Sequence, residues 1–141
     1  MRKNIVIIFA CLLTGILTVP AATNGKAAVH PIDASQAACL KKAKGTMPRA
    51  KCYSDAAESW EKDVTKTYAA VLKALPSDCR SVFETSQSAW EKYRDAEFEV
   101  IAKMYNSRKG TGYISVRILL RMNIVKQRAL LLEDWLASPN H

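Results

Sequence analysis

Three polar residues in the middle of the chain stand where a helical pattern places its apolar face. At 100° per residue, Gln87, Arg94 and Glu97 fall in one arc. The same arc holds the apolar residues Phe83, Trp90, Tyr93, Ile101 and Met104. A buried charge or amide is destabilising unless it is paired. We favour an internal network that fixes helix register, and the alternative is a groove that offers Arg94 and Glu97 to a ligand.

Catalytic motifs are absent from the sequence, which has no Gly-x-Ser-x-Gly elbow, phosphate-binding glycine loop or His-Glu-x-x-His pair. Glu91 and Asp95 share a face at i,i+4, where paired carboxylates could exchange protons, but that face is typical of a solvated surface. The two histidines, His30 and His141, lie near the ends of the predicted mature chain, and no Cys-x-x-Cys pair occurs. We therefore predict a protein that is not an enzyme and that has no metal site and no cofactor.

The last third of the chain supplies candidate partners for the polar arc. Three arginines that border an apolar face lie within about 40° of one another on a helical wheel: Arg117, Arg121 and Arg128. One or two of them are expected to reach Glu97 across the bundle. Arg94 has two nearer candidates, Glu97 at i+3 and Glu91 at i−3.

Four helical segments are predicted to position these side chains. A short helix covers residues 36–44, with Ser35 as its candidate cap, and the long helices cover 49–75, 77–106 and 113–137. Ser77 or Asp78 is the candidate cap of the second long helix. Because no strand alternation appears, we predict an all-α fold, a small antiparallel bundle of three long helices plus one short N-terminal helix.

Apolar stripes on the long helices predict the core. The first long helix carries Trp60, Val64, Tyr68, Val71 and Leu75, and the last carries Val116, Leu120, Ile124, Leu131 and Trp135. Each long helix has one tryptophan on its apolar side: Trp60, Trp90 or Trp135. We expect the three indoles to meet in one core rather than to form an aromatic binding platform.

The N-terminus has the pattern of an export signal. Two basic residues precede an apolar run that ends near Val19, and small residues then stand at the −3 and −1 positions of a cleavage site before Ala22. We predict a cleaved signal peptide over residues 1–21, a flexible leader over 22–35 and a helical domain over 36–138. The predicted location is periplasmic or secreted, with no transmembrane segment in the mature chain.

The cysteines agree with an oxidising compartment. Cys39 and Cys52 flank the break between the first two predicted helices, so a disulfide there would staple one to the other. Cys79 is then left over, or it competes for one of the two. Cys11 follows too short an apolar run, with the bulky Phe9 before it, to favour a lipoprotein anchor.

The charge balance favours an acidic partner. Removing Arg2 and Lys3 with the signal leaves 19 basic against 13 acidic residues, a net charge near +6. Such a surface suits an acidic protein, anionic lipid or cell-wall polymer, whereas nucleic acid fits badly with export. The simplest alternative is a solvated basic surface with no partner.

The motif residues, taken in order, resemble the LprI-like lysozyme-inhibitor domain, a bacterial exported helical domain, over about residues 38–132. The residues that carry the resemblance are Cys39, Cys52, Trp60, Glu61, Val64, Thr65, Tyr68, Gln87, Trp90, Tyr93, Arg94, Asp95, Glu97, Gly110, Thr111, Lys126, Gln127 and Arg128. Many members carry cysteines at the place of Phe98 and near Leu120, and an asparagine at that of Thr65. Here the second cysteine pair is lost as a unit, and Cys79 lies outside the common pattern.

The resemblance implies an envelope protein that inhibits lysozyme, or another peptidoglycan hydrolase, by protein–protein contact. The motif residues would serve that contact or the fold. Because the chain is basic, an acidic lysozyme or a bacterial autolysin fits better than a strongly basic lysozyme. The alternative is a non-catalytic envelope protein whose basic face binds anionic lipid or cell-wall polymer.

Overall fold

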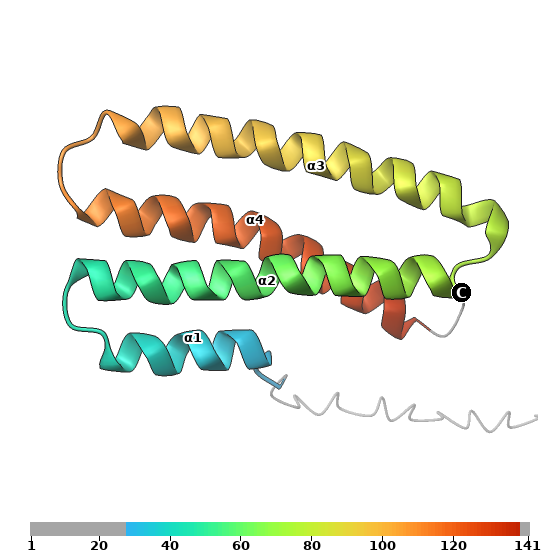
Figure 1. Cartoon of the computed structure of the whole chain (residues 1–141), viewed down its shortest axis with the longest axis horizontal. Coiled ribbons are helices and arrows are strands. Elements are labelled where there is room, and N and C mark those ends of the chain that lie inside the picture. The colour runs from blue at the N-terminus through green and yellow to red at the C-terminus, as the bar shows by residue number, and fades with distance from the viewer. Residues whose placement is uncertain (1–27, 139–141) are drawn as a thin grey trace, which may run out of the picture.

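Four α-helices make up the computed structural model, which describes residues 28–138. They are α1 (Pro31–Lys42), α2 (Thr46–Ala74), α3 (Ser77–Asn106) and α4 (Gly112–Ala137) (Figure 1). Consecutive helices run in opposite directions, and the described range contains no strand. The predicted all-α antiparallel bundle is confirmed. The predicted signal peptide, including Cys11, lies outside the described residues.

The helix boundaries follow from local chemistry. They correct the predicted start of α1 and the predicted caps of α1 and α3. α1 begins at Pro31, five residues before the predicted start, so Ser35 lies inside it and is not its cap. The cap is His30, whose Nδ1 accepts a hydrogen bond from the backbone N–H of Ile32 at 3.2 Å, while proline suits the first helical position. α3 follows Pro76 with no side-chain cap, so neither Ser77 nor Asp78 has the predicted role.

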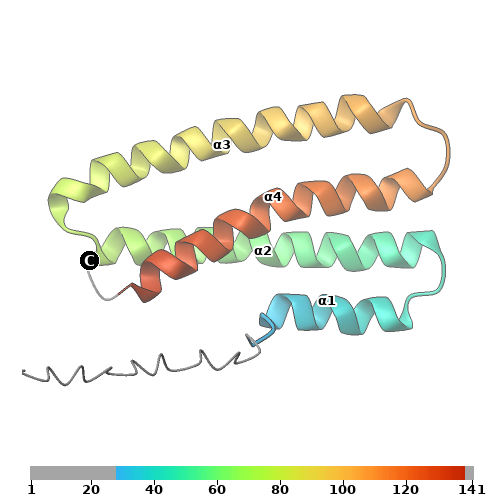
Figure 2. The ribbon, with the colours of Figure 1, turned by 180° about the vertical axis from the view of Figure 1, so that it is seen from behind.

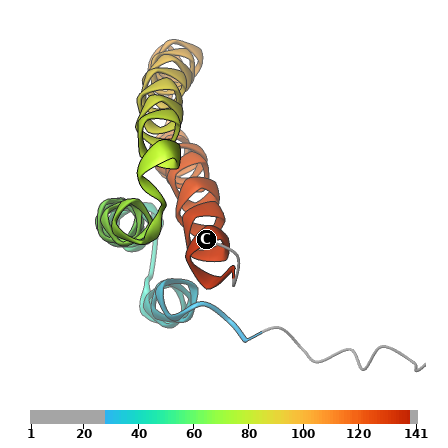
Figure 3. The same cartoon turned by 90° about the vertical axis from the view of Figure 1, so that its right-hand side faces the viewer.

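The helices α2 and α4 form the centre of the bundle. They run in the same direction and share the largest interface in the molecule (Figures 1 and 2). α1 packs against α2 on one side of this pair, and α3 packs against α4 on the other. The view along the bundle shows α1 and α3 at its two edges (Figure 3). α3 hardly touches α2, which leaves a cleft between them.

The core lies between α2 and α4. Its most deeply buried side chains are Trp60, Val71, Val125 and Leu132. Trp90 and Trp135 pack against this cluster, as predicted for the three indoles. α4, however, turns a different face inward than predicted: Met122, Val125, Ala129 and Leu132 are buried, whereas Val116 and Leu131 are 39% and 41% exposed. Tyr93 and Met104 of α3, also predicted to face the core, are more than half exposed.

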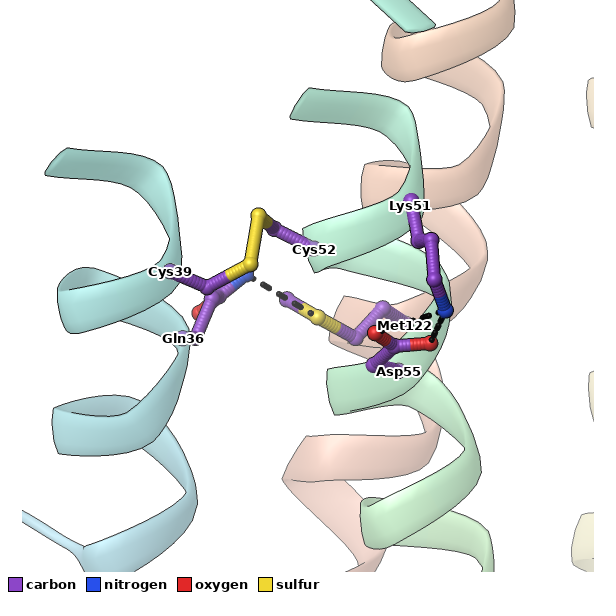
Figure 4. The surroundings of a disulfide bond; sticks show 6 residues. All are labelled: Gln36, Cys39, Lys51, Cys52, Asp55 and Met122. Atoms are coloured by element: carbon purple, nitrogen blue, oxygen red, sulfur yellow. Dashed lines mark hydrogen bonds and ion pairs between the residues drawn. A yellow bond between two sulfur atoms is a disulfide. The ribbon is translucent and has the colours of Figure 1, made fainter. Parts of the chain in front are cut away.

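The predicted disulfide is present. Cys39 of α1 and Cys52 of α2 are bonded, with 5.7 Å between their Cα atoms. Beside it, the amide of Gln36 donates to the sulfur of Met122 at 3.4 Å, so α1 also reaches α4 (Figure 4). Cys79 is exposed and forms no disulfide with either described cysteine. Among residues 28–138, no helix combines the length and the hydrophobicity that a bilayer span requires.

Candidate partner-binding surface

Gln87 and Arg128 satisfy each other in the core. The guanidinium of Arg128 donates from Nε and Nη2 to the side-chain oxygen of Gln87, at 3.1 and 2.9 Å. The amide nitrogen of Gln87 donates in turn to Glu91 at 3.1 Å. Both Gln87 and Arg128 are more than nine-tenths buried. One or two of the three arginines were expected to reach Glu97, but Arg128 binds Gln87, almost three helical turns from Glu97.

Two indole rings line the path of the Arg128 side chain. Its guanidinium carbon lies 5.7 Å from the ring centre of Trp90 and 5.4 Å from that of Trp135. Burial lowers the pKa of Arg128, and the nearby carboxylate of Glu91 opposes that shift. A guanidinium still keeps its charge at neutral pH, so the Gln87 carbonyl and the aromatic faces stabilise a buried cation. This part of the motif has a structural role.

Arg94 binds its neighbour rather than either predicted carboxylate. Its Nε and Nη2 donate to Oδ1 of Asp95 at 2.9 and 2.8 Å. The guanidinium also lies over the rings of Trp90 and Phe98, at 5.2 and 6.0 Å. The predicted pairings with Glu97 and Glu91 do not form in the described structure. Glu97 is half-buried, and within residues 28–138 it has no ion-pair partner.

The cleft between α2 and α3 is lined by three motif residues of α3: Gln87, Trp90 and Arg94. It has a volume of about 290 Å³, and its other walls are Glu61, Val64, Thr65 and Tyr68 of α2, Glu91 of α3 and Val125 of α4. The motif residues Tyr93, Asp95 and Glu97 do not line it. The charged side chains of the lining are two glutamates and one arginine, so the cleft is not a basic site.

The turn between α3 and α4 lies at one end of the bundle, at the same end as the α1–α2 turn (Figure 1). Gly110 has a φ of +110°, a conformation that favours glycine, and Thr111 directly precedes α4. Arg108 lies against a pair of tyrosines, 5.6 Å from the ring of Tyr105 and 5.5 Å from that of Tyr113, whose ring centres are 6.2 Å apart. Gly110 and Thr111 of the motif therefore form the turn beside Arg108, whose guanidinium packs on two tyrosine rings.

One end of the bundle carries cations and no carboxylate. Both the α1–α2 turn and the α3–α4 turn lie there (Figures 1 and 2), and the hydroxyl of Ser115 donates to the carbonyl of Thr46 across it at 3.4 Å. We call its nine basic residues the basic end: Lys41, Lys42, Lys44, Arg49, Lys51, Lys103, Arg108, Lys109 and Arg117. The sequence has no acidic residue from 34 to 54 or from 100 to 132.

The rest of the described chain has the opposite balance. Outside the basic end it carries 13 acidic and nine basic residues. Only two members of the basic end form ion pairs in the described structure: Lys51 with Asp55 and Lys103 with Glu99. Each of these carboxylates is one turn away from its lysine on the same helix, toward the middle of the bundle. The molecule is therefore polarised along its long axis, which the net charge alone did not reveal.

His30 packs onto the domain, although it was predicted to lie in a flexible leader. Its ring stacks on Trp60, with 4.3 Å between ring centres, and its Nε2 lies 3.1 Å from Glu133 of α4. Beside it, Lys126 of α4 binds Asp33 of α1 at 2.6 Å. The segment before residue 36, predicted to be a flexible leader, is thus fixed by contacts from His30 onward.

His30, Asp63 and Glu133 form a group that could hold a metal, since one donor atom from each lies within 4.8 Å of the others. Oδ2 of Asp63 is buried and lacks a hydrogen-bond partner among the described residues. The histidine tautomer opposes the idea. Its Nδ1 accepts from Ile32, so the neutral ring carries its proton on Nε2, the atom that faces the carboxylates. In this conformation Nε2 is a donor to Glu133 and not a metal ligand.

A sequence model of one protein family, described as lysozyme inhibitor LprI, matches residues 39–132. This chain belongs to the LprI family. The match includes the disulfide, the Gln87–Arg128 pair and the α3–α4 turn, whereas His30, Asp33, Gln36, Glu133 and Trp135 lie outside it. The family is one of inhibitors, and the resemblance drawn from the motif residues is confirmed.

A solved structure shares the LprI fold seen here. The crystal structure of an uncharacterized protein from Burkholderia thailandensis superposes with a TM-score of 0.73 at 27% sequence identity. The match covers 80% of this chain but 58% of that one, so the chain spans little more than half of its relative. No curated protein matches the sequence.

Proposed function

We propose that this LprI domain is exported and inhibits a lysozyme, or another peptidoglycan hydrolase, by direct contact through its basic end. The observation that supports this most strongly is the nine cations without a carboxylate at the end of the bundle that holds the α1–α2 and α3–α4 turns. Opposite charge on the partner would raise the association rate and fix the orientation of docking.

The chemistry of glycoside hydrolysis explains why the basic end would inhibit a lysozyme. Glycosidases of this kind hold two carboxyl groups on either side of the bond that they cleave. The α3–α4 turn, which carries Arg108 and Lys109, would place their N–H groups against those carboxylates and block the substrate groove. The guanidinium fork matches a carboxylate in two hydrogen bonds. Because Tyr105 and Tyr113 already hold Arg108, less conformational entropy would be lost on binding.

The rest of the structure supports this role indirectly. The Cys39–Cys52 disulfide suits an oxidising compartment outside the cytoplasm. The motif core of Gln87, Trp90 and Arg128 holds α3 on α4, and the turn between these helices depends on that packing. These motif residues would thus contribute to inhibition indirectly, by holding the α3–α4 turn in position.

Purified domain from residue 22 onward tests the proposal in lysis assays with acidic lysozymes, bacterial autolysins and a strongly basic lysozyme. We expect micromolar inhibition of at least one acidic enzyme and weaker inhibition of the basic one. Inhibition should weaken as ionic strength rises, because the contact is electrostatic. Absence of inhibition across all three classes would contradict the proposal.

The basic end also supports a second candidate, which is binding to an anionic cell-wall polymer or lipid headgroup. Its exposed lysines and arginines would neutralise phosphate groups without specific geometry. Retention on anionic vesicles or on purified wall, together with no inhibition of any hydrolase, would favour this candidate over the first.

A further inference from the structure

The exposed apolar residues of the described chain are concentrated on two of its helices. Of the ten large hydrophobic residues that are exposed within residues 28–138, eight belong to α3 and α4. α3 has three buried residues in a length of 30, although its sequence is amphipathic. A helix covered so poorly in the monomer has an apolar face with no partner.

Regular spacing shows what kind of partner the face fits. We define the α3 stripe as Val82, Ser86, Ala89, Tyr93, Ala96 and Val100, which alternate in steps of four and three. We define the α4 stripe as Tyr113, Val116, Leu120, Ile124, Gln127 and Leu131. Every member is exposed or half-buried. Steps of three and four along both helices are the pattern of helix-on-helix packing in bundles and coiled coils.

Both stripes face the same side of the molecule. On the α3 wheel, Phe83 points to α4, Glu91 lies about 80° to the side of the α2 cleft, and the stripe lies about 100° to the other side. On the α4 wheel, Arg128 points to α3, and the stripe again lies on the side away from the core residue Val125. The α3 and α4 stripes therefore form one apolar face, on the side of the α3–α4 pair that α2 does not cover.

We propose that this face binds the same face of a second copy, in a two-fold dimer where α3 meets α3 and α4 meets α4, each antiparallel. A two-fold interface requires that one axis serve both helices at the same height. Facing α3–α4 contacts give the heights, because their residue numbers total 215 to 223 and most total 218 or 219: Gln87 with Arg128, Phe83 with Trp135, Trp90 with Arg128, Tyr105 with Tyr113, Phe98 with Arg121, and Asn106 with Arg117. An axis that crosses α3 between Arg94 and Asp95 therefore crosses α4 near Asn123.

That single axis pairs large with small or with complementary residues on both helices. On α3 it brings Tyr93 to Ala96 of the second copy, and Ala89 to Val100. On α4 it brings Val116 to Leu131 of the second copy. Interlocking of large and small side chains is what close helix packing requires.

Charges select this register over its neighbours. Lys92 and Glu99 are exposed on α3, along the outer edge of the stripe. The proposed axis places Lys92 beside Glu99 of the second copy, twice by symmetry, with an offset of two residues, or about 3 Å, along the helices that the long side chains can span. Moving the axis by half a heptad in one direction would place Lys92 opposite Lys92 of the second copy. Moving it by half a heptad in the other direction would place Glu99 opposite Glu99 of the second copy. Like charges across a helix pair are destabilising.

The size of the face meets the lower limit for a specific dimer. The stripes span 19 residues of each helix, or roughly 29 Å of length, and two adjacent helices are about 18 Å wide. Each copy would bury roughly 500 Å², so the total is about 1,000 Å², the smallest area expected of a specific interface. The two basic ends would point in opposite directions and remain accessible.

Sedimentation of the purified mature domain tests the dimer, with circular dichroism as the check on folding. We expect twice the monomer mass at micromolar concentration, and a monomer for Val100→Glu, which places a charge against Ala89 of the second copy. Met47→Glu is the matched control, because Met47 is an exposed apolar residue of α2 outside the face, and it should remain dimeric. A monomeric wild type, or a dimeric folded Val100→Glu variant, would overturn the proposal.

Charge exchange tests the register. Lys92→Glu and Glu99→Lys should each weaken the dimer by up to about tenfold, and the double variant should restore it. Failure of the double variant to restore affinity would overturn the proposed register.

Cross-linking tests the antiparallel direction. In a Cys79→Ser background, Asn123→Cys should give a linked dimer with oxidised glutathione, since two thiols become a disulfide and the glutathione disulfide becomes two thiols. The native Cys79 pair would lie at opposite ends of the dimer and should not cross-link. A Cys79-linked dimer would indicate parallel pairing and would contradict the arrangement.

Discussion

Arg128 of α4 donates both of its bonded nitrogens to the side-chain oxygen of Gln87 on α3, in a site where both residues are more than nine-tenths buried. This pair joins the edge helix to the central helices near the middle of the motif. Because α3 hardly contacts α2, its position depends on α4, and this contact is the polar part of that interface.

The contact between Gln87 and Arg128 predicts that substitutions of the two residues are coupled in their effect on the free energy of unfolding. Gln87→Leu should lower the free energy of unfolding by about 2–4 kcal/mol, because it leaves a buried guanidinium without its acceptor. Gln87→Leu combined with Arg128→Met should be less destabilised than the two single changes together. Urea unfolding of the four proteins measures this coupling. Strict additivity would show that the two side chains do not depend on each other.

Removing the disulfide should destabilise the domain without changing its fold. Cys39→Ser with Cys52→Ser should cost about 3 kcal/mol in the chain-entropy account, since the bridge closes a loop of 13 residues in sequence separation. Thermal unfolding should show the same loss when the wild type is reduced. Cys79→Ser is the control and should leave the melting temperature unchanged, because that thiol is exposed.

His30→Ala should loosen the start of α1. The change removes the cap on Ile32, the stacking on Trp60 and the contact with Glu133. We expect a loss of about 1–2 kcal/mol and faster amide exchange in the first turns of α1. Val29→Ala serves as the control, since Val29 is 64% exposed. Equal exchange in the two variants would mean that His30 does not hold the helix.

Arg94 should matter more to stability than the aspartate that it binds. Asp95 is 66% exposed in its side chain, so Asp95→Ala should change stability by less than about 0.5 kcal/mol. Arg94→Ala also removes packing on Trp90 and Phe98 and should be more destabilising. Equal effects in urea unfolding would show that the ion pair, and not the packing, is the main contribution.

The sequence predicted the helices well because their apolar periodicity and breaks are local properties. The four segments, the Cys39–Cys52 bridge and the burial of Gln87 are all found in the structure. The predicted ion pair between Glu97 and one or two of the three arginines was wrong, because a wheel gives the direction of a side chain but not the height at which two helices meet. His30 was missed as a cap because its role depends on Trp60 and Glu133, which are remote in sequence.

The inward face of α4 was predicted wrongly for a different reason. Val116, Leu120 and Leu131 form a regular apolar stripe, whereas part of the true core face is made of Ala129 and the buried Arg128. Periodicity identifies an apolar stripe without saying what covers it. In the proposed dimer, the second copy would cover this stripe.

The measurement closest to the proposed function is binding and inhibition of a responsive hydrolase by two charge-reversed variants. Arg108→Glu with Lys109→Glu alters the tip of the basic end, and Lys66→Glu with Lys73→Glu makes the same change in net charge on exposed positions of α2 outside it. We predict that the tip variant loses at least about 100-fold in affinity and inhibition, while the α2 variant stays within about threefold of wild type. Equal losses in the two variants, or full inhibition by the tip variant, would contradict inhibition through the basic end.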